Sequence, residues 1–245
     1  MKRLLLAFVI LVMGCVHTGE SQNKVRTVKK SASTYELIGD SVYRIGDDNG
    51  WGTGFAVRAA SGKKYILTND HVCSDLRDTE RLHASDGKTY ELKVKAKDDQ
   101  HDLCIVSAPK NAKPLKVSET EPKYRDRVYT AGFPAIPDMT TASGITLTID
   151  KEDMPDEKSI AECVGPKYEV KTGTIRGMFG PMEIPQCYMT APRLQTSVKS
   201  DSGASGSPMI NSRGEVIGVL MSVVGDIQFA QMVPLKYVRD FLSKY

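Results

Sequence analysis

The sequence lacks a strong excess of charge of either sign. Its 33 Lys and Arg residues nearly balance its 30 Asp and Glu residues, which leaves a net charge of +3. It also lacks a block of Lys and Arg with interleaved aromatic residues, the pattern typical of nucleic-acid binding. We therefore expect no nucleic-acid partner.

A hydrophobic run long enough to cross a membrane is missing as well. The run LLLAFVILVMG follows MKR at the N-terminus and is shorter than the roughly 20 apolar residues of a transmembrane helix. A charged start and a short apolar run are typical of a secretory signal, and the ending LVMGC is similar to the lipobox of bacterial lipoproteins. We predict a signal segment over residues 1–15 with lipidation at Cys15, followed by a flexible tether over residues 16–34. The protein would then be exported and anchored to a bacterial membrane on its periplasmic or cell-surface side, with a plain cleaved signal as the alternative.

Cysteine is scarce, with five residues in the chain. In an exported protein the four that follow Cys15 can form disulfides in three complete pairings, and the sequence does not choose between them. A metal site is an alternative, because His71 is close in sequence to Cys73 and His101 to Cys104. The spacing of these pairs fits zinc ligands only in part. We expect no metal and no cofactor, and we interpret Cys73 and Cys104 as small buried apolar residues. The remaining two cysteines are Cys163 and Cys187.

Short β-prone runs cut by Gly, Asp and Asn fill the chain from Tyr35 onward, among them DSVYRIG, WGTGFAVRA, DLCIVSA and EVIGVLMSV. Their spacing of about ten residues, without alternating helices, predicts an all-β sandwich or barrel. The polar segment Pro137–Lys167 is interpreted as a surface insertion. The end, PLKYVRDFLSKY, opens with a proline and predicts one helix. Its apolar face would carry Leu235, Val238, Phe241 or Leu242, and Tyr245.

Histidine is rare too, so each of the four residues can be weighed. His17 lies in the tether and His83 in a predicted polar loop. His71 ends the apolar run YILTNDHV, and a strand end can present a side chain rigidly to a cleft.

An acidic residue opens the next apolar run, HDLCIV. Strand alternation predicts that His101 and Asp102 point to opposite faces, with Asp102 on the inward face beside Cys104 and Val106. A buried carboxylate is costly unless it is paired. His71 would supply that partner.

Serine and glycine are concentrated in DSGASGSPMI, residues 201–210. A turn explains part of this composition. The alternative is a serine held on a tight loop whose backbone N–H groups can receive an oxyanion. With Ser205 as that serine, the order His71, Asp102, Ser205 is the chymotrypsin-like one, unlike that of subtilisin or the α/β-hydrolases.

Several strings carry a family resemblance: WGTGFAV, LTNDHV, HDLCIV, AGFP, TGTIRG, LQTSVKSDSGASGSPMINSRGEVIGV and FAQMVP. Together they resemble trypsin-like serine peptidases of the bacterial HtrA and glutamyl-endopeptidase type, from about Val42 to the C-terminus with the insertion left out. The resemblance implies a chymotrypsin-like fold of two six-stranded β-barrels with the active site in the cleft between them. We expect a peptidase domain over residues 35–245, made of an N-terminal barrel over about 35–120, a C-terminal barrel over about 121–233 and a helix over 234–245.

The resemblance also implies a serine endopeptidase that acts on protein or peptide substrates. Ser205 would be the nucleophile, His71 the general base and Asp102 the residue that orients it, as in the Ser-His-Asp scheme. The backbone N–H groups of Gly203 and Ser205 would form the oxyanion hole. Ala204 stands where zymogen-activated trypsins have an Asp, so activation by that ion pair is not expected. The alternative function is a catalytically inactive binding module with a protease fold, and the intact triad argues against it.

The expected specificity pocket departs from that of trypsin. Lys199 stands six residues before Ser205, at the base of the pocket, where an Asp would attract basic side chains. In one geometry the Lys199 ammonium enters the pocket and attracts Asp or Glu. In the other it extends into solvent and leaves a pocket that favours small apolar residues, and we favour this geometry because an unpaired buried ammonium is costly. That pocket would be lined by Met221, Ser222, Val223 and Ile227, and both geometries exclude a preference for Arg or Lys.

Overall fold

The computed structural model describes residues 36–47, 50–74, 76, 81–84, 87–134, 169–179, 182–184, 187–189, 191–221 and 229–245. All of them belong to one compact unit, Ala32–Tyr245. The predicted signal segment, the tether and the predicted insertion all lie outside the described residues. None of the described helices is long and apolar enough to span a membrane.

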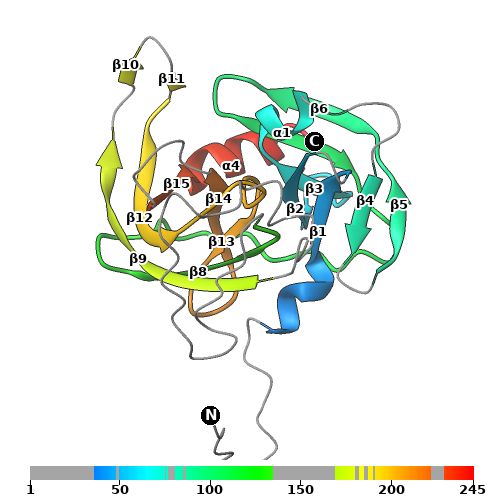
Figure 1. The fold of residues 1–245 in the computed structure, drawn as a ribbon, viewed down its shortest axis with the longest axis horizontal. Helices are drawn as coiled ribbons and strands as arrows, with labels where there is room; N and C mark the ends of the chain where they lie inside the picture. The colour runs from blue at the N-terminus through cyan, green and yellow to red at the C-terminus, as the bar shows by residue number, and fades with distance from the viewer. Residues whose placement is uncertain are drawn as a thin grey trace, which may run out of the picture. The chain divides into compact units, whose positions relative to one another are not determined.

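The N-terminal half is an antiparallel sheet of seven strands in the order β5-β4-β1-β2-β3-β7-β6 (Figure 1). A short 3-10 helix, Glu36–Ser41, leads into the first strand. Only two residues separate the edge strands β5 and β6 along the chain, so the sheet curls until its two edges come close. The bounds are β1 Val42–Gly46, β2 Trp51–Arg58, β3 Lys64–Thr68, β4 Arg81–Ala84, β5 Thr89–Glu91, β6 Val94–Asp98 and β7 Leu103–Ser107.

The C-terminal half is a closed six-stranded barrel in the order β12-β15-β14-β13-β8-β9. Its strands are β8 Arg127–Gly132, β9 Glu169–Phe179, β12 Arg193–Lys199, β13 Pro208–Ile210, β14 Val216–Met221 and β15 Phe229–Pro234. A separate hairpin pairs β10 Met182–Ile184 with β11 Cys187–Met189. The predicted all-β chymotrypsin-like fold is confirmed. The described N-terminal sheet differs in detail, since it has seven strands and an open strand order instead of a closed ring of six.

The predicted C-terminal helix is confirmed as α4, Leu235–Leu242. Its buried residues are Leu235, Val238, Phe241 and Leu242, which the spacing of apolar residues predicts. Tyr245 was predicted on the same face, but the helix ends before it. The helix contacts β14 and β15 of the barrel. The carbonyls of Leu242, the last helical residue, and of Tyr245 accept hydrogen bonds from the turn between β2 and β3, so the end of the chain links the two halves.

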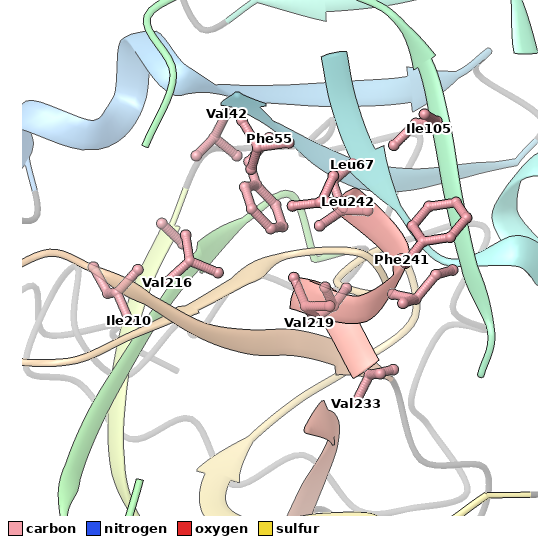
Figure 2. Packing of buried hydrophobic residues seen from close by; sticks show 14 of the residues in the cluster. Val42, Phe55, Leu67, Ile105, Ile210, Val216, Val219, Val233, Phe241 and Leu242 are labelled. Atoms are coloured by element: carbon pink, nitrogen blue, oxygen red, sulfur yellow. The ribbon is translucent and has the colours of Figure 1, made fainter. Parts of the chain in front are cut away.

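One hydrophobic cluster is shared by the two halves (Figure 2). Phe55, Leu67 and Ile105 come from the N-terminal sheet, whereas Val219 and Phe241 come from the barrel and from α4, and each is at most 1% exposed. Burial of one such side chain is worth about 1.5–3 kcal/mol. The shared core therefore fixes the two halves against each other, and with them the loops that meet between them.

Candidate active site

His71 and Asp102 form a hydrogen-bonded pair. His71 lies in α1, Asp70–Ser74, a short helix that begins two residues after β3 ends. Its Nδ1 lies 2.9 Å and 3.0 Å from the two carboxylate oxygens of Asp102, and its backbone N–H donates to Asp102 Oδ1 at 3.0 Å. A carboxylate can only accept, so Nδ1 carries the proton and the lone pair of the neutral ring is on Nε2. The His71 side chain is 47% exposed and that of Asp102 is 14% exposed, which leaves the ring open to a ligand.

Asp102 reaches His71 by a route that strand alternation does not predict. Strand β7 begins only at Leu103, and Asp102 precedes it with a φ of 57°. This left-handed conformation is uncommon outside glycine, although Asp tolerates it better than most residues. The Asn69 side-chain amide donates to the Asp102 carbonyl at 3.0 Å and holds this turn. The pairing with His71 was predicted correctly, but the explanation by alternating faces was wrong.

The other described histidines make different contacts. His101 Nδ1 lies 3.0 Å from both carboxylate oxygens of Asp98, and its ring stacks on Tyr237 with centroids 4.2 Å apart. His83 lies on β4 instead of in a loop, with Nε2 3.1 Å from the Gly46 carbonyl. The described chain thus contains three histidines, of which His71 is the one paired with Asp102.

Ser205 lies on a tight loop between β12 and β13 and is 7% exposed. Gly203 has a φ of 81°, and a Cβ on it would stand 2.5 Å from Trp51 Nε1 and 2.6 Å from the Phe133 carbonyl oxygen. A side chain cannot fit at this position, and the positive φ is one that glycine adopts readily. The sequence therefore needs a glycine two residues before Ser205.

Thr53 of β2 holds this loop against the N-terminal sheet by hydrogen bonds, a role that the sequence did not predict. Its backbone N–H donates to the Ser205 carbonyl at 2.7 Å, and its hydroxyl donates to the Gly203 carbonyl at 2.8 Å. The same hydroxyl accepts the Phe133 N–H at 3.1 Å. The only signal for this role was the position of Thr53 in the string WGTG.

Gly52 shows how closely the serine loop approaches α1. A Cβ placed on Gly52 would stand 2.7 Å from both methyl groups of Val72 and 3.3 Å from the Ser205 carbonyl oxygen. Val72 is the neighbour of His71 in α1. The loop that carries Ser205 and the helix that carries His71 thus both lie against Gly52 of β2.

Cys73 and Cys104 form a disulfide with a sequence separation of 31. The prediction that they are merely small buried residues was wrong, although both are buried. Each cysteine lies two residues after a member of the His71–Asp102 pair, so the bridge joins the helix and the strand that carry the pair. Closing a loop of this length stabilises the fold by about 3.7 kcal/mol in the chain-entropy view. The two bridged sulfurs are not thiolate ligands for a metal, and the described residues contain no group of three or more His, Cys, Asp or Glu that could hold one.

The predicted specificity residues are only partly within the described chain. Lys199 is the last residue of β12 and is exposed. Met221 ends β14 and is half-buried. Ser222, Val223 and Ile227 lie outside the described residues, as do Cys15 and Cys163, and the side chain of Cys187 is not described.

A comparison with family models gives a match to the trypsin-like peptidase domain over residues 52–219. The chain belongs to this family. Among curated trypsin-like peptidases, the periplasmic serine endoprotease DegP of Salmonella typhimurium is 24% identical over 200 residues, which cover 79% of this chain and 35% of that protein. The mitochondrial serine protease HTRA2 of Bos taurus is 28% identical over 199 residues, which cover 79% of this chain and 36% of that protein. The chain thus spans about a third of the length of the curated relatives it matches, and the predicted resemblance to the HtrA type is confirmed.

Solved structures of trypsin-like peptidases agree on the fold. The active form of the Rv3671c protease from M. tuberculosis aligns with a TM-score of 0.61 at 20% identity, covering 84% of this chain and 81% of that chain. An HtrA-type protease, AlgW with a tripeptide, aligns with a TM-score of 0.61 at 17% identity, covering 84% of this chain and 60% of that chain. At such identities the likeness concerns the fold, and the chemistry has to be argued from the residues themselves.

Proposed function

We propose that this chain is a serine endopeptidase that hydrolyses peptide bonds with His71, Asp102 and Ser205. The observation that carries the proposal is the double contact of the Asp102 carboxylate with Nδ1 and the backbone N–H of His71. It fixes both the tautomer and the direction of the imidazole, as the base of an acyl-transfer enzyme requires. The relatives that match this chain carry serine protease names, which agrees with the proposal.

The proposed reaction follows from these positions. Ser205 Oγ attacks the carbonyl carbon of the scissile peptide bond, and Nε2 of His71 takes the hydroxyl proton. The oxyanion is stabilised by the N–H groups of Gly203 and Ser205, donors that the positive φ of Gly203 and the hydrogen bonds from Thr53 hold in place. His71 then protonates the leaving amine, and the acyl-enzyme forms. In the second half of the reaction His71 takes a proton from water, which attacks the ester, releases the acid product and frees Ser205.

The substrate preference follows from the Lys199 side chain. Its exposure at the end of β12 favours the geometry in which the ammonium extends into solvent and the pocket is apolar. We expect a library of peptides to be cut after small apolar residues, and Lys199→Ala to leave that preference unchanged within about twofold, because a solvated charge contributes little. The profile of cleaved peptides from purified wild type and Lys199→Ala measures both. If the wild type hydrolyses none of the peptides, the proposed function is contradicted. Efficient cutting after Arg or Lys in both proteins would contradict only the pocket assignment.

The proposal includes export and attachment to a bacterial membrane through a lipid on Cys15. The periplasmic naming of relatives such as DegP agrees with export. We expect Cys15→Ser to move the protein from the membrane fraction to the soluble fraction, since a hydrocarbon anchor accounts for the attachment. The intact mass of the mature chain from its host checks the site. An unmodified N-terminus at another residue would contradict it.

A further inference from the structure

Trp51 is the only tryptophan of the chain, and its indole makes a hydrogen bond from one half of the protein to the other. It is the first residue of β2 in the N-terminal sheet, whereas its acceptor, Phe133, directly follows β8 of the barrel. Trp51 Nε1 donates to the Phe133 carbonyl at 2.8 Å. Since Pro134 has no N–H, the peptide bond after Phe133 can offer only this oxygen for hydrogen bonding. Phe133 is 6% exposed, so loss of the indole donor would be costly at this position.

This hydrogen bond lies against Gly203. The Cβ that glycine lacks would stand 2.5 Å from Nε1 and 3.0 Å from Cδ1 of the Trp51 indole. It would also stand 2.6 Å from the Phe133 carbonyl oxygen. Donor and acceptor thus both lie where a side chain of Gly203 would begin. The two groups close off one side of Gly203, the residue whose N–H is the proposed oxyanion donor.

Thr53 connects the same segments through a second set of contacts. Its hydroxyl donates to the Gly203 carbonyl at 2.8 Å and accepts the Phe133 N–H at 3.1 Å. Phe133 is therefore held through both its N–H and its carbonyl. Gly203 is held through its carbonyl and by the contact at its Cα, and these contacts maintain the φ of 81° that sets the direction of its N–H.

The residue between Gly203 and Ser205 cannot order the loop by charge. It is Ala204, which is 7% exposed and has no side-chain group that could form an ion pair or a hydrogen bond. The order of the loop at Gly203 therefore depends on its neutral contacts with β2. The indole that makes one of these contacts is itself held in place, since the guanidinium carbon of the buried Arg44 lies 5.9 Å from the centre of the Trp51 ring.

We propose that Trp51 is a positioning residue for the oxyanion hole. Its indole N–H holds the Phe133 carbonyl against Gly203 and thereby keeps the Gly203 N–H directed at the oxyanion. The negative charge on that oxygen develops in the transition state and is absent from the bound substrate, so a misdirected donor lowers kcat and leaves KM nearly unchanged. The inference rests on the proposed function, in which Gly203 and Ser205 form the oxyanion hole.

Steady-state kinetics of Trp51→Phe test this role, because phenylalanine keeps an aromatic ring but has no N–H. We expect kcat to fall by about tenfold or more, a smaller loss than the roughly 10²–10³-fold of deleting an oxyanion donor outright. KM should change by less than about twofold. Tyr90→Phe is the matched control, since it removes an aromatic hydrogen bond, from Asn111 Nδ2 to the Tyr90 hydroxyl, elsewhere in the same sheet. This control should leave kcat unchanged.

Replacement of Trp51 by benzothienylalanine separates the hydrogen bond from the shape of the indole. In this analogue sulfur takes the place of the N–H, so the size of the ring is nearly kept while the donor is lost. Because the chain has a single tryptophan, the analogue changes no other position. We expect it to lower kcat as Trp51→Phe does, and it gives the answer if the Phe variant does not fold. Fluorotryptophan keeps the N–H and should keep the wild-type kcat.

The NMR signal of the Gly203 amide provides a readout that does not need catalysis. It is recorded for isotope-labelled protein in the Ser205→Ala background, and it should shift or broaden in Trp51→Phe and stay in place in Tyr90→Phe. An unchanged kcat and an unmoved Gly203 signal, in both Trp51→Phe and the benzothienyl variant, would overturn the inference. A loss of activity that appears only in KM would overturn it as well. A wild type that hydrolyses nothing while its Gly203 signal still depends on Trp51 would instead overturn the proposed function and leave the positioning of Gly203 standing.

Discussion

Replacing Ser205 or His71 by alanine should lower kcat/KM for peptide hydrolysis by about 10⁴-fold or more, and the double variant should be little worse than either single one. The reason is that nucleophile and base act in one step, so the loss of either removes the same transition-state stabilisation. Neither variant should unfold, because the loop backbone is held by Thr53 and the His71 ring is half exposed. Steady-state kinetics and thermal unfolding of the same preparations measure both effects.

Two neighbours supply matched controls for these variants. Ser202 lies on the same loop and is exposed, and His83 lies on β4 with its ring on a backbone carbonyl. Ser202→Ala and His83→Ala should each keep activity within about threefold, the range of ordinary surface changes. Activity retained in Ser205→Ala, or lost equally in Ser202→Ala, would remove Ser205 from the proposed role.

Asp102→Asn should lower kcat/KM by about 10⁴-fold near neutral pH while the fold is preserved. The asparagine oxygen can still accept the His71 backbone N–H, which leaves the amide nitrogen facing Nδ1 of the ring. An amide nitrogen can only donate, so Nδ1 must become the acceptor and the proton moves to Nε2. The ring then cannot accept the serine proton, although no contact in the core has changed.

A second histidine–carboxylate pair makes the control for this variant. Asp98 contacts His101 Nδ1 at 3.0 Å, with a geometry close to that of the Asp102–His71 pair, but neither residue belongs to the proposed catalytic set. Asp98→Asn should therefore cost less than about tenfold in kcat/KM, an effect that acts only through the surrounding charge. An equal loss in both variants would show that the kinetics report general damage to this region instead of the tautomer of His71.

The sequence was sufficient for the fold class and for the pairing of His71 with Asp102. Alternating apolar runs predict strands, and the spacing in LKYVRDFL predicts the buried face of α4. Other features could not be predicted from the sequence, because they depend on tertiary contacts. A cysteine on an apolar strand looks like any small core residue, so the Cys73–Cys104 bridge became visible only when α1 was seen beside β7.

The burial of Arg193 is another such feature, because no local sequence pattern predicts it. Arginine is usually exposed, whereas Arg193 at the start of β12 is 3% exposed. The left-handed turn at Asp102 is similar, because it is held by the Asn69 amide across the sheet. The pair itself can thus be predicted from the sequence, whereas the contacts around it depend on the tertiary structure.

The most direct test of the central claim is covalent labelling of the purified wild type with a fluorophosphonate, read by intact mass and peptide mapping. Such reagents modify a serine whose hydroxyl is activated by a neighbouring base. We predict one adduct per chain, located on Ser205, with no adduct in Ser205→Ala and strongly slowed labelling in His71→Ala. Failure to label Ser205, or labelling at the same rate without His71, would contradict this prediction.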